Sequence, residues 1–378
     1  MPASRQSLSR DQRLDFWRGL CLVDMLLVHL VYKNVQFGNF LGNLLGSYTR
    51  FAAGGFIFIS GLSIGVIFLP RAADPHRRNS TYKALWRRSA FVLGVNYLCA
   101  MGLIIMEIIW GWGPRGNFVQ PLPLLRDILL LREGGDLLPF YVIMIALSPF
   151  LMHALRRKWG WIAILLSSVS VFTWGLWHPW FLALAQHENF PPILWQAVFV
   201  LGLLVGFAWP RYNALTNRAK SLLAAGSWLV AACLFVMEYS YLWGMPQLSF
   251  GIAFVKVPLS TPEALRYLSI IFAIITTTDV LWPYIAETSA AAFVQTLGRK
   301  SLPVYALHLW VVEAMGALAA AYPAMGAWQI SMAFFSILIL WLFALILDVT
   351  SAPKSRHPSH VPALPAIFGP EPLSGAAQ

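Results

Sequence analysis

The sequence predicts an all-α protein: a polytopic membrane helix bundle of about ten transmembrane helices with both termini in the cytoplasm. Its 378 residues are 58% hydrophobic and 11% charged, with a mean hydropathy of +0.64, which is too apolar for a water-soluble globule. Stretches of roughly 18 to 22 apolar residues recur, and this length matches the ~30 Å hydrocarbon core of a bilayer. Such runs are too long for the strands of a membrane barrel, so we expect helices.

The apolar stretches follow one another through residues 1–350, which we interpret as one membrane domain. Residues 351–378 are rich in Pro, Ser and Ala and are typical of a disordered cytoplasmic tail. The predicted spans lie near residues 14–34, 48–69, 89–110, 136–155, 159–178, 192–209, 221–243, 265–284, 302–321 and 327–348.

Positive charge is distributed unevenly between the segments that connect these spans. If the N-terminus is cytoplasmic, the segments on the cytoplasmic side hold 20 of the 27 Lys and Arg residues, and the opposite side holds seven. This asymmetry is the positive-inside pattern, and it supports an even number of spans with both termini inside. The net charge of +11 therefore orients the chain in a lipid bilayer and does not indicate a nucleic-acid partner.

The first span, LDFWRGLCLVDMLLVHLVY, carries ionisable side chains at membrane depth, where their cost makes a functional role the first hypothesis. Arg18 and His29 are eleven positions apart, which returns them to within about 20° of one helix face, roughly 16 Å apart along the axis. Asp15 precedes Arg18 by three residues, a spacing that allows pairing, and it lies near the same stripe. Gly19 beside them allows close approach of another helix or a ligand. Anchoring of the helix end and interhelical packing remain as alternative roles.

Two later spans also contain polar side chains. Asp279 follows three threonines in the eighth span, and we expect it to bond locally or to a neighbouring helix. In the ninth span Tyr305 and His308 are three residues apart and share a face. His308 could orient a substrate or contact the first helix, and simple interhelical packing is equally open. The three cysteines all fall within spans, so no disulfide framework and no metal site is predicted.

The segment RDQRLDFWRGLCLVDMLLVH resembles the opening of the membrane acyltransferase superfamily, also called acyltransferase 3. In that superfamily a first-helix Arg is followed, after ten intervening residues, by a His that is regarded as catalytic. Four further segments resemble successive blocks of the OpgC branch, which is named for proteins that succinylate osmoregulated periplasmic glucans. They are FAAGGFIFISGLSIG (51–65), DLLPFYVIMIALSPFLM (136–152), LWQAVFVLGLLVG (194–206) and LGRKSLPVYALHLWVVE (297–313).

The resemblance implies a multi-pass enzyme of the bacterial cytoplasmic (inner) membrane. It would transfer a short acyl group from an acyl-CoA co-substrate, succinyl-CoA or acetyl-CoA, to a periplasmic or extracellular glycan, with no permanently bound cofactor. The second block departs from the family pattern, because Arg50 is the single charged residue before the Phe-rich stretch.

Acyl transfer to a sugar also fits the chemistry of these residues. A sugar hydroxyl is a poor nucleophile, so the enzyme needs a base with a pKa near 7, and His29 is the candidate, with Arg18 and Asp15 as catalytic partners. Attack on a thioester develops negative charge on the carbonyl oxygen, which requires hydrogen-bond donors. The sequence leaves several donors open. They are Ser60, Asn96, His308 and the backbone N–H groups near Gly54, Gly55 and Gly61.

The donor and the acceptor would lie on opposite sides of the membrane, so the acyl group has to cross the bilayer within the protein. We expect residues 70–88 to form a cytoplasmic loop in which Arg71, Arg87 and Arg88 hold the phosphates of acyl-CoA. An ordinary basic loop that fixes topology would carry the same charge.

One function of another class remains as an alternative to the acyltransferase. Ten helices with buried acidic and basic groups would also suit a proton-coupled transporter or a flippase for an envelope precursor, although the two halves of the chain show no repeated hydropathy pattern. A homo-oligomer is compatible with the sequence as well.

Overall fold

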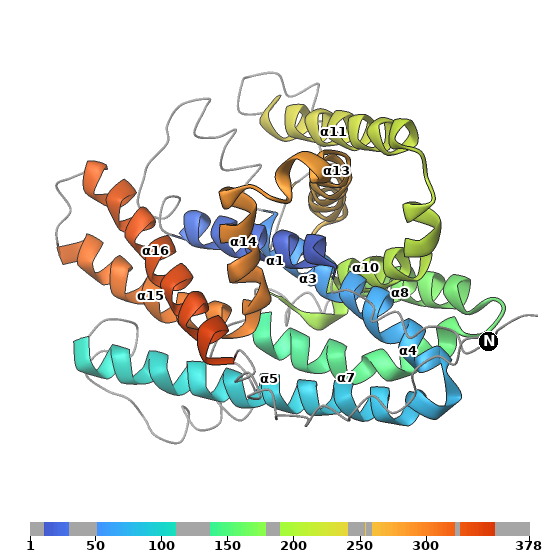
Figure 1. Cartoon of the computed structure of the whole chain (residues 1–378), viewed down its shortest axis with the longest axis horizontal. Coiled ribbons are helices and arrows are strands. Elements are labelled where there is room, and N and C mark those ends of the chain that lie inside the picture. Colours follow the sequence, from blue (N-terminus) through green and yellow to red (C-terminus); the bar gives the residue numbers. More distant parts are fainter. Residues whose placement is uncertain are drawn as a thin grey trace, which may run out of the picture.

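The computed structural model describes residues 11–29, 51–110, 137–178, 190–240, 254, 259–321 and 326–351. These ranges are helical and contain no strand, which confirms the predicted all-α class (Figure 1). The elements are α1 (Gln12–Leu27), α3 (Ala52–Ser63), the π-helix η2 (Ile64–Phe68), α4 (Leu69–Ala73), α5 (Pro75–Trp110), α7 (Leu137–Leu155), α8 (Gly160–Trp177), α10 (Pro192–Asn213), α11 (Asn217–Ser240), α13 (Thr261–Ile285), α14 (Ser289–Arg299), α15 (Ser301–Ala321) and α16 (Gly326–Ser351).

Seven helical segments in the described ranges are long and apolar enough to cross a membrane. They correspond to the predicted second to eighth spans, so the chain has the character of a multi-pass membrane protein. The predicted first, ninth and tenth spans are the helices α1, α15 and α16, which are not among the seven, and the total of ten spans stays a prediction. Residues 30–34 of the first span and the predicted tail after Ser351 lie outside the described residues.

The two central helical runs, α3 with η2 and α10, cross through glycines spaced four residues apart. A Cβ atom at Gly61 would lie 2.0 Å from the Phe199 carbonyl oxygen, and one at Gly202 would lie 2.1 Å from the Phe58 carbonyl oxygen. Small residues therefore let the two backbones touch, which is a common way for membrane helices to associate without a hydrophobic driving force. The crossing fixes α3, which carries Ser60 and Ser63, at the centre of the bundle.

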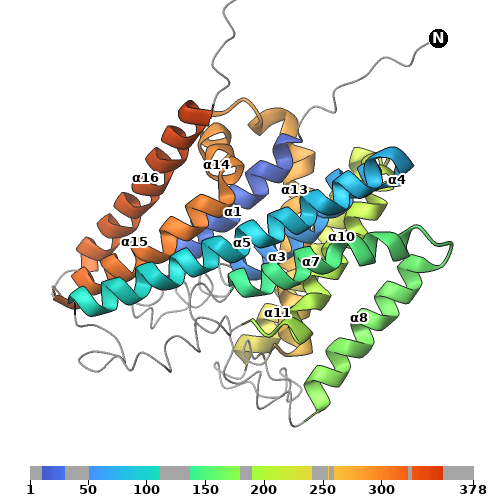
Figure 2. The same ribbon diagram turned by 90° about the horizontal axis from the view of Figure 1, so that it is seen from below.

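Helix α14 is the main element that the sequence analysis missed. It lies between the predicted eighth and ninth spans, and its N-cap Thr288 accepts a hydrogen bond from the Ala291 N–H at 3.2 Å. It packs beside α1, as both views show (Figures 1 and 2). A Cβ atom at Gly298 would lie 1.7 Å from the Asp15 carbonyl oxygen, and one at Gly19 would lie 1.9 Å from the Val294 carbonyl oxygen. Gly19 thus serves close approach of a helix, one of its two expected roles.

The predicted loop at residues 70–88 is wrong, because these residues are helical. They form the end of α4 and the first turns of α5, which runs without interruption to Trp110. Asp74 explains the start of α5: its Oδ1 accepts a hydrogen bond from the His76 N–H at 2.9 Å, and Pro75 occupies the first helical position. An Asp cap followed by Pro is a strong helix-start signal. The basic residues of this segment favour a loop by composition, but the cap and the proline allow the helix to begin there.

One end of the bundle collects ion pairs between distant parts of the chain. Asp279 of α13 pairs with Arg13 of α1 and with Lys220 of α11, whose Nζ lies 2.7 Å from the Asp279 Oδ2. Burial by itself would lower the pKa of the Arg13 guanidinium, but hydrogen bonds and charges from Asp11 and Asp279 outweigh burial and raise it. The expected bond of Asp279 to a neighbouring helix is therefore present, and it joins three helices.

Candidate active site

Arg18 links the first helix to α3. Its Nη2 donates a hydrogen bond to the Ser63 Oγ at 2.5 Å, and its Nη1 lies 3.5 Å from the Asp15 Oδ1. The Ser63 Oγ donates in turn to the Ile59 carbonyl oxygen at 2.6 Å. The pairing of Asp15 with Arg18 that the spacing predicts is present, and the guanidinium is held between α1 and the centre of the bundle.

Aromatic and hydroxyl side chains continue from Arg18 into the interior. The buried Tyr141 of α7 lies beside Ser60 and within electrostatic range of Arg18 and Tyr305. The ring of Phe56 contacts both Tyr141 and Tyr305. Its centre lies 5.8 Å from the ring centre of Tyr141 and 6.1 Å from that of Tyr305. Helices α1, α3, α7 and α15 thus contribute to one interior group, which we call the polar row. Its members are Arg18, Ser60, Ser63, Tyr141 and Tyr305.

Two imidazoles lie next to this row. The ring of His308 is 1% exposed, and its centre lies 4.8 Å from that of Tyr305 and 5.9 Å from that of His29. The contact joins the last described residue of the first helix to α15, as one of the sequence interpretations of His308 expected. His29 itself is half-buried. A neutral imidazole can accept a proton, so this end of the polar row can supply a base.

The structure changes the choice of oxyanion donors. The Gly55 N–H is bonded to the Phe51 carbonyl oxygen at 2.6 Å, and Gly61 lies in the interior of α3, where the N–H groups serve the helix itself. Gly54 instead packs against the Tyr267 side chain. Asn96 of α5 is fully buried, and neither of its amide atoms has a hydrogen-bond partner in the described ranges. The N–H groups of Gly55 and Gly61 are therefore engaged within α3, while the Gly54 N–H, in the first turn of that helix, and the side chains stay candidate donors.

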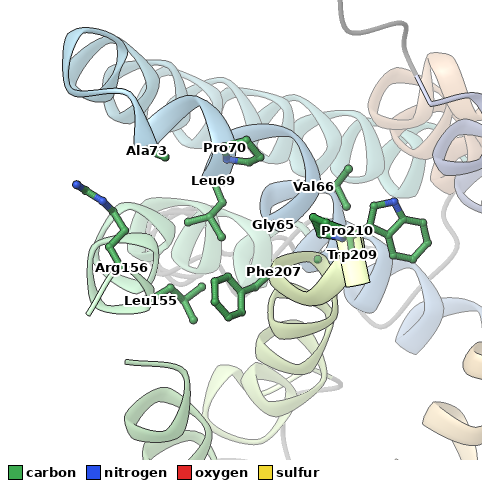
Figure 3. A pocket seen from close by; sticks show the side chains of 11 residues that line it. Gly65, Val66, Leu69, Pro70, Ala73, Leu155, Arg156, Phe207, Trp209 and Pro210 are labelled. Carbon is green, nitrogen blue, oxygen red and sulfur yellow. The ribbon is translucent and has the colours of Figure 1, made fainter. Parts of the chain in front are cut away.

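The three arginines expected to bind phosphates lie on two helices, Arg71 on α4 and Arg87 and Arg88 on α5. Arg71, Arg87 and Arg88 are all exposed, but Arg87 lies twelve residues, or about 18 Å, along α5 from its first residue. A cleft of about 280 Å³ opens between α4 and the ends of α7 and α10 (Figure 3). Its lining is apolar except for Arg156, and it includes Pro70 and Ala73, which flank Arg71, but no residue of α5.

One residue that lines this cleft contacts the first helix. Trp209 lines the cleft and contacts Trp17 edge-on, with ring centres 5.9 Å apart. Trp17 is 1% exposed and directly precedes Arg18 in the chain. A side chain that lines the cleft therefore contacts the residue that directly precedes Arg18.

Ser63 and Tyr141 are the members of the polar row that the sequence analysis did not select. Both lie within segments quoted for the family resemblance, yet a lone hydroxyl in an apolar helix carries no spacing signal. Their importance comes from which helices pack together, and that is a tertiary property. Within the described ranges no group of three His, Cys, Asp or Glu side chains is arranged to hold a metal ion.

These features define a class: a helical membrane protein whose interior holds an Arg–Asp pair, with a buried carboxylate, and a pair of imidazoles. The chain belongs to the OpgC family, since the family model described as OpgC protein matches residues 10–352. Membership indicates a membrane acyltransferase that modifies glycans. No curated protein and no solved structure gives a significant match.

Proposed function

We propose that this protein is an O-acyltransferase that moves a succinyl or acetyl group from cytoplasmic acyl-CoA to a periplasmic or extracellular glycan. The observation that carries the proposal is the contact between His29 and His308 at one end of the polar row whose other end is Arg18. An ionic group and a base at two depths of one helix suit a reaction whose donor and acceptor come from opposite sides of a bilayer. In this proposal the bilayer is the bacterial inner membrane and the ends of the chain are cytoplasmic.

His29 acts as the general base. Its imidazole takes the proton of the reacting hydroxyl while the oxygen attacks the thioester carbonyl carbon, so a C–O bond forms as the proton leaves. Collapse of the tetrahedral intermediate breaks the C–S bond, and the imidazolium returns its proton to the departing thiolate, which leaves as the thiol of coenzyme A. Ser60 and Asn96 are the proposed donors to the developing oxyanion.

Arg18 and Asp15 serve the donor side of the reaction. Asp15 and Ser63 hold the Arg18 guanidinium in place, so its charge can bind the carrier of the acyl group. The cleft beside Arg71 and Arg156 is the proposed entrance for acyl-CoA, since it is open at the surface and one of its lining residues, Trp209, contacts the first helix. Arg87 and Arg88 would then contact only the outermost phosphates.

The test is the His29→Ala variant, expressed in cells that lack the chromosomal copy. Removal of a general base lowers rates by about 10²- to 10⁴-fold, so we expect acylation of envelope glycans to be lost while the amount of glycan is unchanged. Mass spectrometry of the isolated glycans measures both quantities. The matched control is His153→Ala, an exposed histidine in the last turn of α7. Unchanged acylation with lost glycan export would instead support the transporter alternative.

A further inference from the structure

His308 has a fixed tautomer. Its Nδ1 lies 2.5 Å from the Tyr305 carbonyl oxygen, and a carbonyl oxygen can only accept, so Nδ1 carries the hydrogen. A positively charged imidazole at this depth in a membrane bundle would be costly, so the ring is neutral. The Nε2 atom is then a lone-pair acceptor and cannot donate.

This acceptor is buried, and it has no hydrogen-bond partner among the described residues. Its two neighbouring rings are those of Tyr305 and His29, and neither gives it a hydrogen bond. With ring centres 5.9 Å apart, the two imidazoles are too far apart to bond directly and close enough for one small polar ligand to contact both. Buried polar atoms are normally hydrogen-bonded, so this acceptor is available to a donor that arrives with the substrate.

The number of hydrogens on the reacting hydroxyl identifies the donor to His308 Nε2. In the proposed reaction the attacking hydroxyl has a single hydrogen, and it gives that hydrogen to His29. It therefore cannot also donate to His308, so Nε2 needs a second donor close to the reacting oxygen. In a sugar, a neighbouring hydroxyl lies roughly one hydrogen-bond length from the reacting one, which fits the separation of the two rings.

We propose that His308 Nε2 accepts a hydrogen bond from a second hydroxyl of the acceptor sugar, next to the hydroxyl that is acylated. This inference rests on the proposed function and deepens it, because it makes the acceptor a polyol and His308 a specificity-determining residue. His29 accepts the proton of the reacting hydroxyl, and His308 accepts a hydrogen bond from the neighbouring hydroxyl. An acceptor that lacks the neighbour leaves Nε2 buried and unsatisfied, and sites built to bond a substrate hydroxyl reject analogues without it.

The experiment uses the full chain in detergent with acetyl-CoA or succinyl-CoA and a gluco-oligosaccharide acceptor, compared with its monodeoxy analogues. For the wild type, one analogue loses the reacting hydroxyl and gives no product. A second analogue keeps the reacting hydroxyl and shows kcat/KM lowered by about tenfold or more. The variants are His308→Phe, which keeps a ring without an acceptor, and His308→Gln, whose amide oxygen can accept near the position of Nε2. His153→Gln is the control.

We expect His308→Phe to have the same kcat/KM with the second analogue as with the parent sugar. We expect His308→Gln to keep at least part of the wild-type difference in kcat/KM between the two sugars. Equal discrimination by wild type and His308→Phe, with a uniformly lower rate, would show a structural role and overturn the inference while leaving the proposed function intact. If His308→Phe fails to fold, discrimination by the wild type and His308→Gln decides, and a wild type indifferent to every hydroxyl but the reacting one overturns the inference. A wild type that acylates no sugar, although it is folded, overturns both proposals.

Discussion

At the scale of single residues, Arg18 is held by specific contacts within the first helix and to α3. It bonds to Ser63 of α3 and pairs with Asp15, and Tyr141 lies within electrostatic range. Asp15 is buried, so loss of the guanidinium would leave a carboxylate without its partner inside the bundle. The same contacts that hold Arg18 in place therefore make it hard to replace.

We predict that Arg18→Gln lowers the rate of acyl transfer by about ten- to a hundredfold, because a hydrogen bond from a charged group to the carrier of the acyl group contributes about 1.5–3 kcal/mol. Arg18→Lys should recover only part of this loss, because an ammonium group cannot keep the fork geometry that reaches Ser63 and Asp15 together. The assay is acyl transfer by purified protein, and Arg157→Gln, on the exposed turn after α7, is the control. Full activity in Arg18→Lys would mean that only the charge matters.

The residue scale also shows how far the sequence could predict the site. A spacing of three within one helix was enough to pair Asp15 with Arg18, because the geometry is local. The meeting of His29 with His308 depends on α1 and α15 lying side by side, although the residues are 279 positions apart. Sequence reasoning could name both histidines but could leave their contact only as one alternative.

At the scale of elements, α14 decides where the first helix lies. Its backbone touches that of α1 at Gly298 and Gly19, and the adjoining residues of α1 include Asp15 and Arg18. Long apolar stretches predict spans well, because hydropathy is a property of the segment itself. A short helix between two spans, and a helix such as α5 that begins in a basic segment, are recognised by their caps, Thr288 and Asp74, rather than by hydropathy.

We predict that Gly298→Ala destabilises the protein by about 1–3 kcal/mol and lowers activity, because the new Cβ atom would push α14 away from the first helix. The measurement is the melting temperature in detergent together with acyl transfer. Gly94→Ala on α5 is the matched control, since nothing lies within 4 Å of its added Cβ atom and alanine favours a helix. Equal melting temperatures for the two variants would contradict the tight α1–α14 contact.

At the scale of the whole molecule, basic residues and ion pairs gather where many helices begin or end. Arg13 and Lys220 meet on Asp279, and Arg299 and Lys300 meet on Asp348 of α16. The charge asymmetry in the sequence predicted that these segments share one side of the membrane. The structure adds that the charges also join the helices to one another, so the residues expected to orient the chain also hold the ends of these helices together.

This arrangement predicts the orientation of the chain in the cell membrane. In a Cys233→Ser background, where Cys21 and Cys99 are buried, Ser80→Cys near the start of α5 should react with an impermeant maleimide only after the cells are permeabilised. His178→Cys at the far end of α8 should react in intact spheroplasts. The reverse labelling pattern would place the cleft beside Arg71 outside the cell. Cytoplasmic acyl-CoA could not reach it there, so that result would exclude the proposed entrance for the donor even if the histidine pair proved catalytic.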